Sequence, residues 1–162
     1  MSRAHERAYR LLAERVQLRA PARYTLYATL AAVVASGAWW LIAHYAAGLF
    51  PALSDDLVRA GQEGVALKVH GAMAMLALIA FGAMLFQHAP RGWALARNRG
   101  SGALVVASLA LLTLTGYALY YLVTDAGHSA MSVAHWVIGV LLVPLLVVHI
   151  VRGRRSRGRH FR

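Results

Sequence analysis

Four long apolar segments dominate the sequence and restrict the chain to folds that a lipid bilayer can accommodate. They cover residues 24–47, 65–88, 101–123 and 131–151. Each segment is close to the roughly 20 residues that a helix needs to cross a hydrocarbon core about 30 Å thick. Because backbone groups in lipid must be hydrogen-bonded internally, each segment is predicted to be a transmembrane helix. The predicted fold is an all-α membrane protein, an up-and-down bundle of four transmembrane helices.

The composition supports a membrane location and excludes several functional classes. The 162 residues are 59% hydrophobic and only 14% charged, more apolar surface than a soluble domain of this size could bury. The absence of cysteine excludes disulfides, iron–sulfur ligation and the thioether attachment of a c-type haem. The net charge of +11 would suggest nucleic acid in a soluble protein. Membrane topology explains the charge better here, so membrane lipid is expected as a partner and nucleic acid is not.

The chain is predicted to contain one domain with basic flanks. Residues 1–23 alternate apolar side chains with arginine, as in an amphipathic helix that lies on the membrane surface, and carry no signal-peptide cleavage site. Residues 24–152 are expected to form the transmembrane bundle. Residues 153–162 form a basic tail that attracts anionic lipid.

The distribution of basic residues predicts the orientation. Fifteen of the 17 lysine and arginine residues precede the first segment, join the second to the third, or follow the fourth. Those three regions lie on one side of the membrane. Because cytoplasmic loops are enriched in lysine and arginine, both termini are predicted to be cytoplasmic, in a bacterial inner membrane.

Two of the predicted helices each contain two histidines. The second segment has His70 and His88, and the fourth has His135 and His149. These helices run parallel, so His70 and His135 are expected at the outer level and the other two at the cytoplasmic level. Separations of 18 and 14 residues are close to whole numbers of turns, which places each pair on one side of its helix. The corresponding rises of roughly 27 Å and 21 Å differ by about 6 Å, a mismatch that helix tilt or a bend could absorb.

This arrangement suits two b-type haems. A low-spin haem takes two axial nitrogen ligands on opposite faces of the macrocycle, and imidazoles from two facing helices supply them. Polar side chains inside a membrane are costly and usually functional. The predicted axial pairs are His70 with His135 at the outer haem and His88 with His149 at the inner haem.

Two glycines in the third segment repeat the spacing of the histidines. Gly102 and Gly116 are 14 residues apart, as are His135 and His149. Because glycine lets a backbone approach a flat and bulky group, Gly102 and Gly116 are predicted to pack against the haems. Plain helix packing is the alternative role for both.

Several short motifs, taken together, resemble a known family. The chain is similar to the small four-helix cytochrome b subunits of bacterial respiratory enzymes, such as those of hydrogenases, formate dehydrogenases and thiosulfate reductases. The resemblance covers the four segments, most of residues 24–152. It implies the same four ligands, His70, His88, His135 and His149. The motifs are Lys68-Val69-His70-Gly71, Gln87-His88-Ala89-Pro90, Leu114-Thr115-Gly116-Tyr117, Ala134-His135-Trp136 and Val148-His149-Ile150.

The first segment departs from the pattern of that family. In several of its members a first-helix histidine is also a ligand, whereas here the first segment has only His44, at its outer end. His44 could therefore replace His70 at the outer haem. The spacing of 18 between His70 and His88 is also longer than usual. The remaining histidines, His5, His128 and His160, are interpreted as polar anchors.

The predicted function is that of a di-haem b-type cytochrome that carries electrons across the membrane. It would connect the quinone pool with a partner redox protein or subunit, with bound quinone as a further cofactor. Any enzymatic chemistry of such a complex would lie on another subunit. Four basic residues are candidate partners for haem propionates, with topology as their other role: Lys68, Arg91, Arg97 and Arg99.

Two other functions are compatible with membrane histidines. Imidazole also suits zinc, copper and nickel, so a metal-ion transporter is one alternative. Transporters usually place acidic residues near the midplane as well, and none of the four segments contains Asp or Glu in its apolar interior. A membrane anchor subunit without a cofactor is the other alternative, and it gives the four histidines no purpose.

Overall fold

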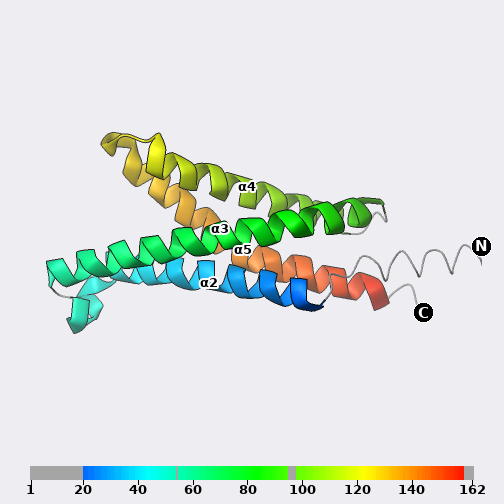
Figure 1. Ribbon diagram of the computed structural model, residues 1–162, viewed down its shortest axis with the longest axis horizontal. Helices are drawn as coiled ribbons and strands as arrows, with labels where there is room; N and C mark the ends of the chain where they lie inside the picture. Colours follow the sequence, from blue (N-terminus) through cyan, green and yellow to red (C-terminus); the bar gives the residue numbers. More distant parts are fainter. Residues whose placement is uncertain (1–19, 54, 95–97, 159–162) are drawn as a thin grey trace, which may run out of the picture. The chain divides into compact units, whose positions relative to one another are not determined.

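The computed structural model describes residues 20–53, 55–94 and 98–158, and these are almost entirely helical (Figure 1). No strand occurs among them. Four of the helices are long and apolar enough to cross a membrane. The prediction of an all-α membrane protein with four transmembrane helices is confirmed, and the chain is a multi-pass membrane protein. The helices are α2 (Ala20–Tyr45), α3 (Asp56–Ala94), α4 (Arg99–Tyr121) and α5 (Asp125–Gly158), with two short 3-10 turns, η1 (Ala47–Leu49) and η2 (Pro51–Leu53).

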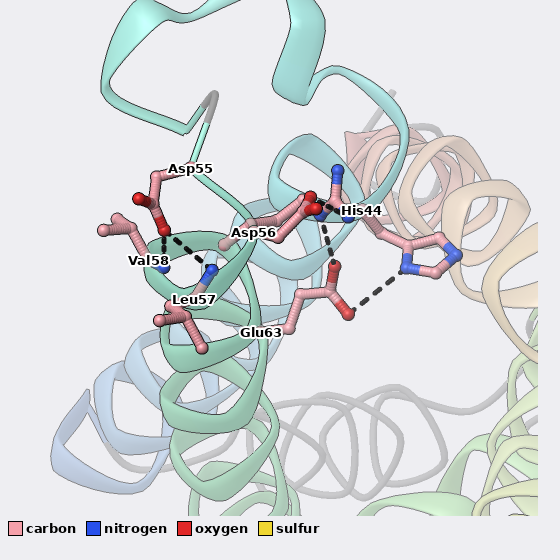
Figure 2. Close-up of polar contacts among 7 residues, drawn as sticks. His44, Asp55, Asp56, Leu57, Val58 and Glu63 are labelled. Atoms are coloured by element: carbon pink, nitrogen blue, oxygen red, sulfur yellow. Dashed lines mark hydrogen bonds and ion pairs between the residues drawn. The ribbon is translucent and has the colours of Figure 1, made fainter.

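Helices α3 and α5 extend well beyond the apolar segments that predicted them. The second segment was expected over 65–88, but α3 begins at Asp56 and continues through Pro90. Its start is capped by Asp55, whose carboxylate oxygen accepts hydrogen bonds from the backbone N–H groups of Leu57 (2.8 Å) and Val58 (3.1 Å) (Figure 2). Such a cap satisfies donors that have no partner within the helix, so the helix extends beyond its apolar part.

The chain divides into two compact units, residues 1–88 and 89–162. In the first unit α2 and α3 are antiparallel and are joined through η1 and η2 (Figure 1). In the second unit α4 and α5 are antiparallel and are joined by residues 122–124. The backbone N–H groups of Leu122 and Val123 both donate to the carbonyl of Ala118, which ends α4 and turns the chain. The predicted interfacial helix within 1–23 falls mostly outside the described residues.

Large apolar side chains are exposed along the long helices. Leu57 and Phe86 are each 84% exposed, and no large side chain is fully buried among the described residues. The most buried residues are small, such as Ala43, Ala66 and Ser36. This pattern suits a lipid environment, in which close helix contact depends on small residues and large apolar side chains face the acyl chains.

Candidate ligand histidines

His70 on α3 is held by α2 through its Nδ1 atom. Nδ1 lies 3.1 Å from the carbonyl oxygen of Val33 and 3.2 Å from Oγ of Ser36. Because a carbonyl can only accept, Nδ1 is assigned as the protonated ring nitrogen and donates. The Ser36 hydroxyl directs its own hydrogen to the carbonyls of Ala32 or Val33, at 2.8 and 3.0 Å, so its oxygen can accept as well. In a neutral imidazole this assignment places the lone pair on Nε2.

His135 on α5 has an equivalent contact with α4. Its Nδ1 lies 2.8 Å from Oγ1 of Thr115. The single hydrogen of that hydroxyl is directed to the carbonyl of Leu111, at 2.7 Å. Nδ1 of His135 is therefore assigned as the donor, and Nε2 again carries the lone pair.

His149, one level further along α5, is held by two polar side chains. Its Nδ1 lies 3.0 Å from Oγ of Ser101 and 3.2 Å from Nδ2 of Asn98. The Ser101 hydroxyl donates to Oδ1 of Asn98 at 2.6 Å, so its oxygen is the acceptor for the ring N–H. The Asn98 amide donates to the backbone carbonyl of His149 at 2.8 Å. The same ring tautomer is assigned to this histidine from the two Ser101 contacts. Because an amide nitrogen can only donate, Nδ2 of Asn98 approaches the protonated Nδ1 without a hydrogen bond to it.

A glycine of the neighbouring helix lies against each of these three rings. A Cβ atom added at Gly37 would stand 3.2 Å from Cε1 of His70. At Gly116 and Gly102 the corresponding distances to Cε1 of His135 and of His149 would be 3.3 and 3.4 Å. Such contacts are tighter than side chains normally make, so glycine gives each ring its room. The predicted packing of Gly102 and Gly116 against haem stays a prediction.

A Ser/Thr–Gly dipeptide is common to the three sites. Ser36-Gly37 faces His70, Thr115-Gly116 faces His135, and Ser101-Gly102 faces His149. The hydroxyl residue binds Nδ1 and the following glycine contacts the ring edge. The sequence prediction included Gly102 and Gly116 and missed Ser36, Ser101 and Asn98. The dipeptides at 101–102 and 115–116 are 14 residues apart, as are His135 and His149. This recurrence of the dipeptide is the signal that could have predicted a role for Ser36 and Ser101.

The fourth predicted ligand, His88, is half-buried on α3 and is the last residue of the first unit. Each predicted axial pair, His70 with His135 and His88 with His149, combines one histidine from each of the two compact units. These pairs remain predictions. Within the described part of the chain, no group of three or more His, Asp or Glu side chains could hold a metal ion.

His44 belongs to a separate polar cluster where α2 meets the start of α3 (Figure 2). Its Nδ1 lies 3.3 Å from a carboxylate oxygen of Glu63, and its ring stacks on Trp40 at a centroid distance of 4.6 Å. Arg59 continues the cluster through contacts with Asp56 at 2.7 Å and Glu63 at 3.9 Å. The ring of His44 is thus engaged by the hairpin itself.

Three of the four predicted propionate partners lie within the described residues. Arg99, at the start of α4, donates to the carbonyl of Trp93 and lies over the indole ring, 5.4 Å from its centroid. Lys68 is exposed on α3, two residues before His70. Arg91 is exposed near the end of α3, and Arg97 lies outside the described residues.

The fold and these contacts define a class of protein. It is a multi-pass, all-α membrane protein whose helix hairpins hold imidazole rings against a hydroxyl group and a glycine of the neighbouring helix. No protein-family model, curated protein or solved structure matches the chain.

Proposed function

We propose that the chain is a di-haem b-type cytochrome that passes electrons across the membrane between the quinone pool and a partner redox protein. One observation carries the proposal. Three histidines within apolar helices have Nδ1 bonded to a neighbouring helix and Nε2 assigned as the nitrogen with the lone pair. Metal-binding histidines are typically fixed in this way, through the ring nitrogen that does not bind the metal.

The residues present fit haem. A b-type haem needs imidazole ligands and no covalent link, and this chain supplies histidine and lacks cysteine. Glycines beside the rings of His70, His135 and His149 let these imidazoles lie close to a helix backbone. His70 with His135, and His88 with His149, are the pairs that would hold the two haems. When bound, haem would supply an iron that takes up and releases one electron at a time.

The chain's own residues would orient and insulate the ligands. The hydroxyls of Ser36, Ser101 and Thr115 limit rotation of the imidazoles, which keeps each ring plane and tautomer fixed. The exposed apolar side chains around them face lipid and exclude water. Lys68 and Arg91 are proposed to pair with propionates, because charge-assisted hydrogen bonds to carboxylates are strong.

The proposed orientation places both termini in the cytoplasm of a bacterial cell. It is supported by the concentration of arginine before and at the start of α2, around the connection from α3 to α4, and from the last turns of α5 onwards. In that orientation His135 lies toward the outer face and His149 toward the cytoplasm. Ligands at the two levels would divide the width of the bilayer into shorter steps for an electron.

The decisive experiment is a reduced-minus-oxidised absorbance spectrum of the detergent-purified chain, with haem counted against protein. We expect about two b-type haems per chain, and His135→Ala or His149→Ala should each remove one of them. His128→Ala is the matched control, because His128 is an exposed histidine at the start of the same helix. Its haem content should equal that of the unsubstituted chain.

Two results would change the proposal. A single haem that is lost in His135→Ala and kept in His149→Ala would retain the outer site and remove the inner one. No haem after expression with ample haem supply would reject the cytochrome. Metal analysis of the purified chain would then test the metal-ion transporter.

A further inference from the structure

Both histidines of α5 face a Ser/Thr–Gly dipeptide, and His149 also has a polar neighbour that precedes α4, Asn98. Nδ1 of His135 contacts the hydroxyl of Thr115. His149 has the equivalent hydroxyl of Ser101. The carboxamide of Asn98 donates to the backbone carbonyl of His149 through Nδ2 and accepts from the Ser101 hydroxyl through Oδ1. Asn98 is 51 residues from His149, so this contact depends on the packing of α4 against α5.

The backbone of Asn98 is adapted to this contact. With φ 54° and ψ 30° it is left-handed, and it is the one non-glycine residue with positive φ in the described part of the chain. Asparagine tolerates this conformation better than most residues. Asn98 precedes the first residue of α4, where its side chain would ordinarily cap a backbone N–H. It makes no such cap, and its carboxamide is directed to α5 and to Ser101 instead.

The carboxamide decides what the Ser101 hydroxyl can do. Because Oδ1 of Asn98 takes the hydroxyl hydrogen at 2.6 Å, Oγ is left to accept from Nδ1–H of His149. A hydroxyl that already donates is a better acceptor, since hydrogen bonds in a chain polarise one another. Without the carboxamide, the Ser101 hydrogen could be directed elsewhere and the ring could change its orientation or tautomer.

We propose that Asn98 is a positioning residue for His149, which fixes the orientation and tautomer of that imidazole and so sets the redox potential of the haem it holds. The haem part of this inference rests on the proposed function. Groups that bind the ring nitrogen remote from the metal alter the basicity of the ligand, and ligand basicity is one of the levers on potential. The haem held by His149 would therefore respond to Asn98, and the haem held by His135 would not.

Two substitutions separate the carboxamide from the backbone conformation. Glycine favours the left-handed region, so Asn98→Gly removes the side-chain contacts without straining the start of α4. Asn98→Asp keeps an acceptor for Ser101 and places a negative charge beside His149, which favours the oxidised state of a nearby haem. The haem that belongs to His149 is identified as the component missing from His149→Ala.

We expect a redox titration of Asn98→Asp to show a lowered midpoint potential for that haem alone. In Asn98→Gly the same component should lose amplitude, while the component that is lost in His135→Ala keeps its amplitude and potential. Thr113→Ser is the control, because Thr113 is exposed on α4 and its hydroxyl bonds the carbonyl of Leu109 in its own helix. Equal shifts in both components, or full retention of both potentials in both Asn98 variants, would overturn the proposal.

A second measurement keeps the inference testable if the chain binds no haem. In the haem-free chain labelled with 15N histidine, protonated and bare ring nitrogens have distinct resonances. His149 should show a protonated Nδ1 and an unprotonated Nε2. Asn98→Gly should change this pattern, while the resonances of His135 stay unchanged. Absence of haem from the unsubstituted chain would reject the proposed function, whereas an unchanged His149 resonance in Asn98→Gly would reject the role of Asn98.

Discussion

The hydroxyl oxygen of Thr115 on α4 lies 2.8 Å from Nδ1 of His135 on α5, and the residue after Thr115 is the glycine that contacts the same ring. The contact joins two helices that are both apolar enough to cross a membrane. Because water is scarce in such a setting, an imidazole N–H without this hydroxyl would lose a partner that solvent could not replace. The relationship gives a direct way to test what positions the ring.

Replacement of Thr115 by valine should weaken the hold on His135. Valine matches threonine in shape and removes the hydroxyl, and a ring donor left without its partner costs about 1–3 kcal/mol. We expect Thr115→Val to reduce the haem content associated with His135, measured as the haem-to-protein ratio. Thr115→Ser keeps the hydroxyl and should preserve it. Equal haem content in the two variants would show that the hydroxyl does not position the ring.

Alanine at Gly116 or Gly102 should displace the adjacent imidazole. The added Cβ would stand 3.3 or 3.4 Å from Cε1 of the histidine, closer than side chains normally pack. We expect Gly116→Ala and Gly102→Ala each to lower the haem-to-protein ratio, through His135 and His149 respectively.

Gly100 provides the matched control on the same helix, because a Cβ there would meet no atom within 4 Å. Alanine is the better helix former by roughly 0.5–1 kcal/mol, so Gly100→Ala should keep its haem and be slightly more stable to heat. Loss of haem in Gly100→Ala to the same extent as in Gly102→Ala would indicate a general helix effect rather than contact with the ring.

Substitution of His44 should leave the haem content unchanged. Its ring is bound to Glu63 and stacked on Trp40 at the hairpin end, with 43% of the side chain exposed. We expect His44→Ala to retain both haems and to lose at most about 1 kcal/mol of stability, as is usual for partly exposed ion pairs. His70→Ala should remove one haem. The reverse result, with haem lost in His44→Ala and kept in His70→Ala, would make His44 the outer ligand.

The orientation can be tested with single cysteines, because the chain contains none of its own. Leu49 in η1 is 79% exposed, and Arg155 is exposed near the end of α5. A membrane-impermeant maleimide added to intact cells should label Leu49→Cys. Arg155→Cys should react only after the membrane is made permeable. Labelling of Arg155→Cys in intact cells would contradict the proposed cytoplasmic C-terminus.

Much of the fold was predictable because a transmembrane helix is encoded by consecutive apolar residues. A run of about 20 apolar residues in lipid has few alternatives to a helix, and the four expected helices are present. Their ends were less predictable. The fourth segment was expected over 131–151, whereas α5 extends over Asp125–Gly158. The added turns are polar, so local capping and backbone hydrogen bonding, rather than hydropathy, determine where the helix begins and ends.

Part of the site also followed from helical periodicity. Residues 14 apart share one side of a helix. Because the spacing of the two glycines on α4 equals that of the two histidines on α5, one antiparallel register allows each glycine to face one histidine. The structure has these contacts, Gly102 with His149 and Gly116 with His135. The periodicity does not specify which atoms meet. The glycines were expected against haem, and the contact that the structure adds is with the imidazole rings.

The sequence alone determined the membrane class, the four helices and the histidines as the notable polar groups, because each depends on local composition and spacing. Only the tertiary structure decided that Ser36, Thr115 and Ser101 bind the ring nitrogens. A helical serine or threonine usually bonds a carbonyl of its own preceding turn. Ser36 and Thr115 do so, whereas Ser101 donates to the side chain of Asn98. The same oxygens also reach histidines 34, 20 and 48 residues away. That second bond depends on the register between two packed helices, which no local pattern encodes.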